Sequence, residues 1–400
     1  MNAWQLELTS RLAHIDAEGL RRSRKILDSP QAIRVNVNGR SVLNFSSNDY
    51  LGLANDNHLL EGFISSAERW GVGSGSAHLV SGHSREHHAL EEELAEFTGR
   101  DKALLFSTGY MANLALVSAF AKRGMSIYQD RLNHASLIDG ALLSGGHLRR
   151  FPHLDTAVLS RWLGAEAGAL STILTDGVFS MDGDLAPIHQ LSKLSRQFNS
   201  LLIVDDAHGL GVLGAKGGGI LEHFAVSQSE VPLVMGTLGK AFGCFGAFVA
   251  GDALSIEWML QAARTYLFTT AIPPAIAGAA RIALKQVASE SWRRERLASL
   301  IQRFRSGAKQ IGLSVMDSMT PIQPVVIGSS QDCYFAGIQL MDEGFLVPAI
   351  RPPTVPKGRA RLRVTLSAKH RDEDVDALLV ALEKVRGLQK NCSEAGFGGE

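Results

Sequence analysis

Residues able to do chemistry follow several of the buried strands that the sequence predicts. Lys240 comes shortly after the apolar run 233–235, within the string TLGKAFGCFGAF. Asp205 directly follows the run 201–204, and His134 lies shortly after a third run. A lysine held away from water in such a place can have a neutral, nucleophilic amine near neutral pH. Taken alone, each residue has an ordinary explanation as a surface lysine, a turn aspartate or a core histidine.

Together these side chains match the needs of one cofactor, pyridoxal phosphate. Its protonated ring nitrogen is a cation that a buried carboxylate such as Asp205 would favour, which makes the ring an electron sink. An imidazole such as His134 would stack on the face of that ring. Gly109 and Tyr110 follow another strand and open a helix, where free backbone N–H groups suit a phosphate. Because these features occur at successive strand ends, the sequence predicts a pyridoxal-phosphate site there.

The strands that must position these residues alternate with helices along the chain. Helical spacing of apolar residues predicts helices at 88–99, 111–122 and 188–198, among others. Strands alternating with helices imply an α/β fold with a mostly parallel sheet covered on both faces. Such sheets bind ligands at the carboxyl ends of their strands, where the residues above lie. The predicted strands are 103–107, 126–128, 172–175, 201–204, 233–235 and 247–250.

The length of 400 residues predicts two domains with additions at the ends. The N-terminal part has a predicted helix over 4–27 and a strand pair over 35–45 that turns at Asn38-Gly39. The expected parts are an N-terminal arm at 1–50, a large cofactor-binding domain at 51–287, a small C-terminal α/β domain at 288–388 and a flexible tail at 389–400.

The composition favours a cytoplasmic enzyme over a protein that binds nucleic acid or a membrane. Lys plus Arg and Asp plus Glu both total 40, so the formal net charge is zero. No overall basic field therefore exists to hold nucleic acid or an anionic bilayer. The N-terminal segment has no apolar signal core, and no apolar run is long enough to span a bilayer. The three cysteines form no CxxC pair, which fits a reducing compartment.

Two other patterns are formal motifs that we interpret as lacking the function they suggest. Residues 209–214 spell GxGxxG after a strand, as in dinucleotide sites, but the string AKGGG that follows does not predict a helix. His83, His87 and His88 cluster, but the adjacent acidic residues predict a solvated helix face. We therefore expect no metal site in this chain.

The string TLGKAFG around Lys240 resembles the lysine signature of the α-oxoamine synthases, which are fold-type I pyridoxal-phosphate enzymes. The resemblance runs from about 20 to 387 and is also carried by NFSSNDYLGL, TDGVFSMDGD, VDDAHG and RPPTVP. These strings are long and mutually ordered, so the similarity is more specific than any single short motif. It implies a large domain with a mostly parallel sheet, a smaller C-terminal α/β domain and a homodimer with its active sites at the interface.

The resemblance also implies roles for individual residues. Lys240 would carry the cofactor covalently, and His134 would stack over the cofactor ring. Asp205 would pair with the ring nitrogen, and His208 would hydrogen-bond the phenolic oxygen. These four residues are the ones expected to take part in catalysis. The other expected cofactor contacts are Gly109, Tyr110, Ser180, Thr237 and, toward the phosphate of the partner subunit, Thr270.

Substrate residues are implied in the same way. Arg363 would take the amino-acid carboxylate through a bidentate contact, a task that arginine suits. Arg21 and Thr354 would line the acyl-substrate site. Asn48 would help to position the substrate from the arm, and His134 would also contact it.

Two strings narrow the expected reaction. LRR at 20–22 and AIRPPTVP at 349–356 are typical of family members that join L-alanine to a pimeloyl thioester, with loss of CO₂, in biotin biosynthesis. The alternative is a sibling that uses glycine, such as 2-amino-3-ketobutyrate ligase or 5-aminolevulinate synthase. The sequence leaves open whether the acyl carrier is coenzyme A or acyl carrier protein. Asp176 stands where family members often have Glu, so we assign it no specific role.

Overall fold

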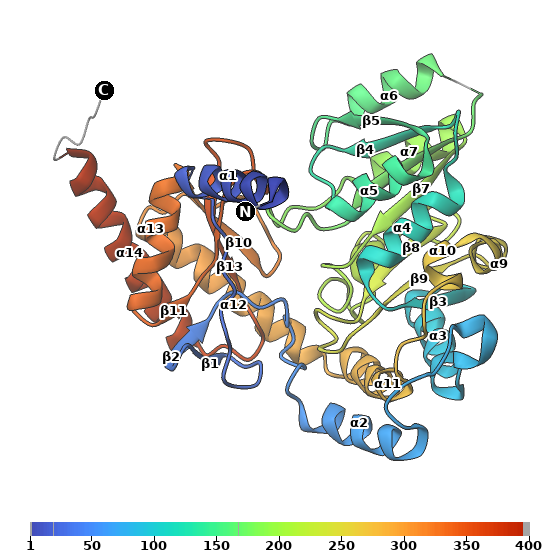
Figure 1. The fold of residues 1–400 in the computed structure, drawn as a ribbon, viewed down its shortest axis with the longest axis horizontal. Coiled ribbons are helices and arrows are strands. Elements are labelled where there is room, and N and C mark those ends of the chain that lie inside the picture. Colours follow the sequence, from blue (N-terminus) through green and yellow to red (C-terminus); the bar gives the residue numbers. More distant parts are fainter. Residues whose placement is uncertain (1, 19, 167, 395–400) are drawn as a thin grey trace. The chain divides into compact units, whose positions relative to one another are not determined.

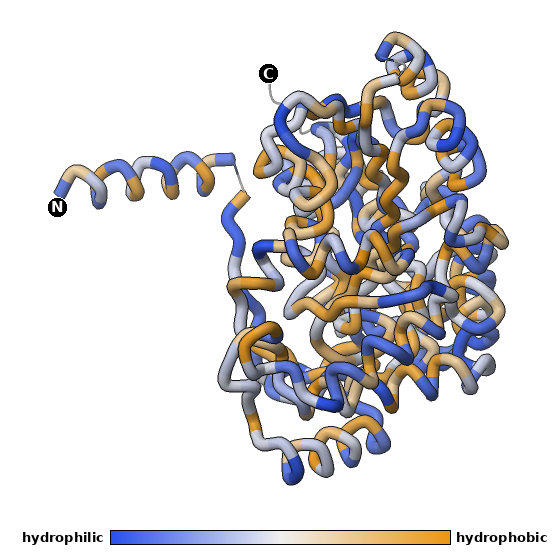
Figure 2. The backbone as a smooth tube through the Cα atoms, turned by 90° about the vertical axis from the view of Figure 1, so that its right-hand side faces the viewer, coloured by the Kyte–Doolittle hydropathy of each residue, from blue (hydrophilic) through white to orange (hydrophobic). Residues whose placement is uncertain are grey.

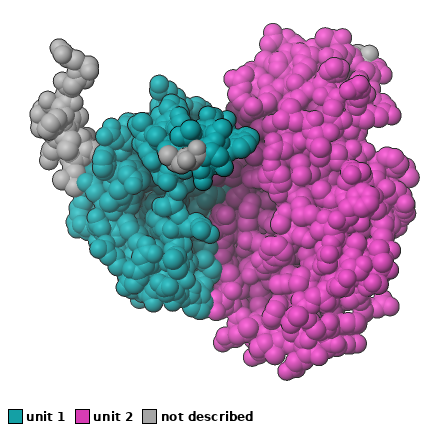
Figure 3. All heavy atoms as spheres, viewed as in Figure 1, with its two compact units in different colours: residues 1–47, 298–400 teal, residues 48–297 magenta. Residues whose placement is uncertain are grey.

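The computed structural model describes residues 2–18, 20–166 and 168–394 (Figure 1). The chain divides into two compact units, coloured separately in Figure 3. Unit 2 is the continuous segment 48–297, and unit 1 combines 1–47 with 298–400. Most of the predicted arm and most of the predicted C-terminal domain therefore belong to the same unit.

Unit 2 is built around a seven-stranded sheet with the order β3-β9-β8-β7-β6-β4-β5. The strands pair in parallel except β9, which runs antiparallel to both of its neighbours. Figure 2 shows hydrophobic colouring along these central strands, as expected for strands covered on both faces. The strands are β3 (Lys102–Phe106), β4 (Ser126–Asp130), β5 (His147–Phe151), β6 (Ser171–Asp176), β7 (Ser200–Asp205), β8 (Leu233–Thr237) and β9 (Ala247–Gly251).

Helices cover the sheet: α4 packs on β8 and β9, α3 packs on β3 and β9, and α7 packs on β7. The mostly parallel α/β fold predicted from the sequence is thus confirmed. A π-helix, η1 (His78–Gly82), lies just before α3. The α-helices of this part are α2 (Asn57–Trp70), α3 (Arg85–Thr98), α4 (Gly109–Phe120), α5 (Ala135–Ser144), α6 (Thr156–Ala165), α7 (Ile188–Phe198), α8 (Gly219–His223), α9 (Ala253–Ala262), α10 (Arg264–Leu267), α11 (Pro274–Ser289) and α12 (Ser291–Gln310), within which the unit boundary falls.

Burial explains which strands the sequence could predict. Every residue of β6 is buried, and its sequence is correspondingly apolar over 172–174 apart from one threonine. Strand β5 reads HLRRF, lies at the end of the sheet, and keeps most of its side chains at least partly exposed. An edge strand needs no continuous apolar run, so β5 gave no signal and is missing from the predicted strands.

Unit 1 contains two three-stranded sheets, with the orders β1-β2-β11 and β10-β13-β12. Asn38 and Gly39 join β1 to β2 with φ angles of 49° and 76°, the positive pair that a tight hairpin of this type requires. The elements of this unit, apart from its share of α12, are α1 (Ala3–Ala17), β1 (Arg34–Val37), β2 (Arg40–Asn44), β10 (Ile322–Gly328), α13 (Ser330–Asp342), β11 (Phe345–Leu346), β12 (Ala349–Ile350), β13 (Ala360–Thr365) and α14 (Asp372–Glu394).

The two ends of the chain differ from the prediction. The N-terminal helix ends at Ala17 rather than at 27, because Ile26 and Asp28 instead hydrogen-bond the hairpin as extended chain. Helix α14 continues to Glu394, so the first six residues of the predicted tail are helical, while 395–400 lie outside the described residues. Among the helices that the structure describes, none combines the length and the apolarity needed to cross a bilayer.

Candidate active site

A pocket of about 190 Å³ lies where the strands of unit 2 end. Eight of the residues predicted from the sequence line it, and five further residues complete its wall. The predicted ones are Gly109, Tyr110, His134, Ser180, Asp205, His208, Thr237 and Lys240, and the others are Asn113, Ser136, Asp176, Ala207 and Met235. The carboxyl ends of β4, β6, β7 and β8 therefore bring chemistry-bearing residues together, as the sheet topology predicts.

Lys240 is held by a tightly folded loop between β8 and β9. Backbone hydrogen bonds from Leu238 to Gly246 (2.9 Å) and from Gly243 to the Lys240 carbonyl (2.9 Å) fix its course. Gly243 has a φ of 64°, and a side chain there would come within 2.4 Å of the backbone carbonyl carbon of Leu53. Only glycine fits this approach without a shift of the backbone, so the loop holds Lys240 at a defined place in the pocket wall.

Asp205 ends β7 as a buried carboxylate with a partner on each oxygen. Its Oδ2 accepts from Asn113 Nδ2 at 2.7 Å, and its Oδ1 accepts from the backbone N–H of Ala207 at 3.0 Å. Asp176 stands beside it at the paired position of β6. Burial, followed by the negative charge of Asp205, raises the pKa of Asp176 well above its usual range.

His134 caps α5 and is linked to Asp205 by hydrogen bonds through the side chains of Ser136 and Asn113. Ser136 Oγ lies 2.7 Å from His134 Nδ1 and accepts from Asn113 Nδ2 at 2.8 Å. Ser136 therefore donates its hydroxyl hydrogen to Nδ1, which places the hydrogen of the neutral ring on Nε2. Desolvation lowers the pKa of His134, Asp205 opposes this shift and Lys240 adds to it, so the ring is neutral at neutral pH.

His208 is buried and oriented by Tyr50. The Tyr50 hydroxyl lies 2.7 Å from His208 Nδ1 and donates to Asn48 Oδ1 at 3.2 Å, which allows Nδ1–H to donate to the hydroxyl. Asn48 is thus joined to the pocket wall through Tyr50, although Asn48 does not itself line the pocket.

The start of α4 forms one end of the pocket. Thr108 caps this helix by accepting from the backbone N–H of Met111 at 3.2 Å, and Gly109 and Tyr110 are the first helical residues. The first turn of a helix presents backbone N–H groups without helical partners, which is a suitable site for an anion. Thr237 lies close by, because a Cβ on Gly109 would be 4.0 Å from Thr237 Cβ.

Besides Asn48, four predicted residues are not among those that line the pocket. Thr270 is exposed, forms an isolated bridge with Ala77, and is not among the residues that line the pocket. The other three, Arg21, Thr354 and Arg363, belong to unit 1. Arg363 is buried in β13, whereas Arg21 is exposed with its guanidinium 3.4 Å from Asp16.

The sequence reasoning missed the residues that orient the predicted ones. Asn113 and Ser136 link His134 to Asp205, and Tyr50 orients His208. A signal for Asn113 existed, since it is an amide within an otherwise apolar stretch of α4, where a buried polar group needs a partner. Residues 209–214 form turns and are followed by a helix of only five residues, so the GxGxxG string opens no long helix.

Comparison with known proteins identifies the class of protein that has this fold and this site. Residues 40–382 match the family model described as aminotransferase class I and II, so the fold and the site define a member of that class. A serine palmitoyltransferase variant from S. paucimobilis, solved with PLP–myriocin bound, has a TM-score of 0.91 at 25% identity, with 96% of this chain and 98% of that chain covered. The resemblance to fold-type I enzymes is thereby confirmed.

Relatives whose sequences are more similar to this chain identify a narrower family within that class. The 8-amino-7-oxononanoate synthase of Methylococcus capsulatus is 56% identical over 373 residues, which cover 93% of this chain and 96% of the relative. The structure of 8-amino-7-oxononanoate synthase from Francisella tularensis has a TM-score of 0.77 at 30% identity, with 87% of this chain and 99% of that chain covered. The chain therefore belongs to the 8-amino-7-oxononanoate synthase family.

Proposed function

We propose that this chain catalyses the decarboxylative condensation of L-alanine with a pimeloyl thioester, using pyridoxal phosphate, in biotin biosynthesis. The products are 8-amino-7-oxononanoate, CO₂ and the free carrier thiol. The observation that carries the proposal is the convergence of Lys240, His134 and Asp205 in one pocket of a chain 56% identical to a synthase of that name.

The donor set of the pocket fits pyridoxal phosphate. A lysine suits its aldehyde, a buried carboxylate suits its ring nitrogen, and a helix start suits its phosphate. Asp205 keeps both oxygens hydrogen-bonded by neutral donors, which leaves its charge to balance a cation in the pocket. Gly109 and Tyr110 at the start of α4, with Ser180 and Thr237, would hold the phosphate end, and His208 would hold the phenolic oxygen.

When bound, the cofactor would supply an electron sink for the bond changes at the amino-acid Cα. Lys240 would anchor the cofactor and, once its amine is released, would move the proton at the Cα of alanine. His134 would present its neutral ring to one face of the site, excluding water from that face. Asp205 would stabilise positive charge at the ring nitrogen, and the raised pKa of Asp176 beside it disfavours a second buried negative charge.

Residues of unit 1, together with Asn48 of unit 2, would select the substrates. Arg363 would bind the alanine carboxylate through its planar fork of N–H donors. Arg21 and Thr354 would line the site of the acyl thioester, and Asn48, joined to His208 through Tyr50, would position the substrate. We further propose a cytoplasmic homodimer in which Thr270 reaches the phosphate bound by the partner subunit, with coenzyme A or acyl carrier protein as the acyl carrier.

The deciding experiment measures thiol release by cofactor-loaded protein with different substrate pairs. We expect release with L-alanine and pimeloyl-coenzyme A or pimeloyl-acyl carrier protein, and the faster of the two identifies the carrier. The controls are glycine with acetyl- or succinyl-coenzyme A. Release confined to a glycine pair would overturn the substrate assignment and favour a glycine-using sibling, whereas an Arg363→Lys variant with an unchanged KM for alanine would remove Arg363 from the proposal.

A further inference from the structure

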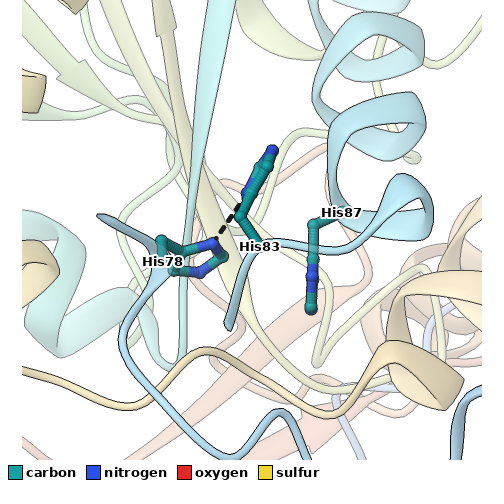
Figure 4. Close-up of side chains that lie close together, drawn as sticks. All are labelled: His78, His83 and His87. Atoms are coloured by element: carbon teal, nitrogen blue, oxygen red, sulfur yellow. Dashed lines mark hydrogen bonds between the residues drawn. The ribbon is translucent and has the colours of Figure 1, made fainter. Parts of the chain in front are cut away.

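A second group of titratable side chains lies in unit 2, outside the pocket that contains Lys240. Four histidines gather where η1 leads into α3, namely His78, His83, His87 and His88. Figure 4 shows the first three, with the hydrogen bond that joins His78 to His83. With Glu91 and Tyr266, three of these histidines line a pocket of about 520 Å³.

His87 is a structural member of this group. Its Nδ1 accepts from the backbone N–H of Ser84 at 2.9 Å, and its Nε2 lies 2.7 Å from the carbonyl of Ile272, to which it must donate. Both ring nitrogens are therefore committed, and His87 closes the start of α3 rather than offering an electron pair to a ligand.

His83, His88 and Glu91 present a different arrangement. His83 Nε2 lies 3.4 Å from His88 Nδ1 and 3.8 Å from Glu91 Oε2. His88 and Glu91 are three residues apart on α3 and so share one face of the helix. Glu91 Oε1 accepts from the backbone N–H of Leu105 at 2.9 Å, which fixes the carboxyl and leaves Oε2 toward the two imidazoles.

The outer ring nitrogens of both histidines face other groups. His83 Nδ1 lies 2.9 Å from His78 Nδ1, and His78 is itself stacked on Tyr266. His88 Nε2 lies 3.4 Å from Glu92 Oε1. When these outer nitrogens carry the ring hydrogens, the inner nitrogens of His83 and His88 point electron pairs at the same place as Glu91 Oε2. Ligating histidines are commonly oriented by such hydrogen bonds on the other ring nitrogen.

We propose that His83 Nε2, His88 Nδ1 and Glu91 Oε2 bind a divalent transition-metal ion such as Zn²⁺. One ligand atom from each of the three residues lies within 4.8 Å of the other two, a spacing that one ion can bridge after small movements of the side chains. Two imidazoles and one carboxylate are ligands that Zn²⁺ accepts, with water completing a tetrahedral site.

The bound ion would connect the segment around η1 to α3. Ala77, next to η1, bridges Thr270, and the Ser76 carbonyl accepts from the backbone N–H of Ala271 at 2.9 Å. An ion at His83, His88 and Glu91 would therefore brace the backbone that carries Thr270. This metal site is independent of the proposed reaction, because none of its three ligands lines the pocket that contains Lys240.

The test is a count of Zn²⁺ bound per chain, on cofactor-loaded protein freed of metal by a chelator, dialysed against Zn²⁺ and analysed for metal. His88→Gln is the central variant because half of its side chain is exposed and its loss should leave the fold intact. His147→Gln is the matched control, since this exposed histidine begins β5 and lines neither pocket. Circular dichroism of the metal-free proteins checks that each variant is folded.

We expect the wild type and His147→Gln to bind one more Zn²⁺ per chain than His88→Gln and His83→Gln. His78→Gln, which removes an orienting partner and not a ligand, should keep the site but weaken it by about 10- to 100-fold. Co²⁺ in place of Zn²⁺ should give visible absorption bands that His88→Gln loses. Equal Zn²⁺ counts in the wild type and His88→Gln would overturn the proposal, as would Co²⁺ bands that survive in both ligand variants.

Discussion

The histidines of unit 2 occupy two contrasting environments. At the carboxyl end of β4, His153 Nδ1 lies 2.9 Å from Asp130 and His153 Nε2 lies 2.7 Å from Asp184. Burial opposes its charge, but these two carboxylates outweigh burial and raise the pKa of His153 to about 10. Near α3, burial and the neighbouring histidines lower the pKa of His78 to about 3 and that of His83 to about 4.

The contrast shows how the partner, and not the residue type, decides what a histidine does. An imidazole between two carboxylates becomes a cation that links them. An imidazole among other imidazoles is disfavoured as a cation, because burial and the neighbouring rings both oppose its protonation. His134 stands between these cases, because Asp205 favours its charge while desolvation and Lys240 oppose it.

The largest effect on turnover should come from replacing Lys240, the residue that would carry the cofactor. Lys240→Ala should lower turnover by at least ~10⁴-fold, because both the covalent attachment and the proton transfer at Cα are lost. The visible absorption of the lysine-linked cofactor should vanish with it. Lys216→Ala, at an exposed loop lysine, is the control and should keep both properties. Full turnover in Lys240→Ala would exclude the mechanism.

Two adjacent aspartates provide the next comparison. Asp205→Asn should lower kcat/KM by ~10²–10⁴-fold, because the cation at the ring nitrogen loses its counter-charge. Asp206→Asn should have a much smaller effect, since burial raises the pKa of Asp206 well above its usual range and disfavours a charge on its carboxyl. Steady-state kinetics on both variants measure the difference. Similar losses in the two would mean that charge at Asp205 is not what matters.

Removing the link between Asp205 and His134 should have an intermediate effect. Asn113→Ala leaves Asp205 Oδ2 and Ser136 Oγ without their shared donor, which should cost ~1–3 kcal/mol of unfolding free energy. The pH–rate profile should also shift, because His134 loses the hydrogen-bond chain that fixes its tautomer. Denaturant unfolding and the pH profile are measured together. A stability loss with an unmoved profile would show Asn113 to be structural only.

The smallest effect is expected from replacing His153, the histidine that lies between two carboxylates. The folded-state pKa of His153 lies above its unfolded value, so its stabilising contribution is complete below about pH 6.5 and is lost as the pH rises through about 10. His153→Gln should therefore be less stable than the wild type by ~1–3 kcal/mol at pH 6. That gap should narrow between pH 7 and 10. A gap that is constant across this range would contradict the assignment of the charge.

The sequence predicted the residues that stand at strand ends and missed those that act through them. Lys240, Asp205 and His134 follow apolar runs, so their common location follows from the topology of a parallel sheet. Asn113 and Ser136 join the site only through pairings across the fold, which spacing along the chain does not reveal. Strand β5 was not predicted for a related reason, since an edge strand lacks the run of buried apolar residues that marks the other strands.

The histidine group shows a second limit of sequence patterns. The acidic residues beside it predicted a solvated helix face, and this is correct for Glu92, whose side chain is 69% exposed. Glu91 is one position further round the helix, with a side chain only 12% exposed and turned toward His83. A run of glutamates reads alike in sequence, whereas the rotation of about 100° per residue divides them between water and the interior.

The division of the chain also has a consequence for its synthesis. Unit 2 is continuous, so all seven strands of its sheet have been synthesised once Gly251 has been added to the chain. Unit 1 joins the two ends, because Leu43 of β2 pairs with Phe345 of β11. The first hairpin must therefore wait for a partner strand translated much later, and such distant pairing is slow to form. The pocket with Lys240 can thus assemble before translation is complete, while the unit that carries Arg363 closes last.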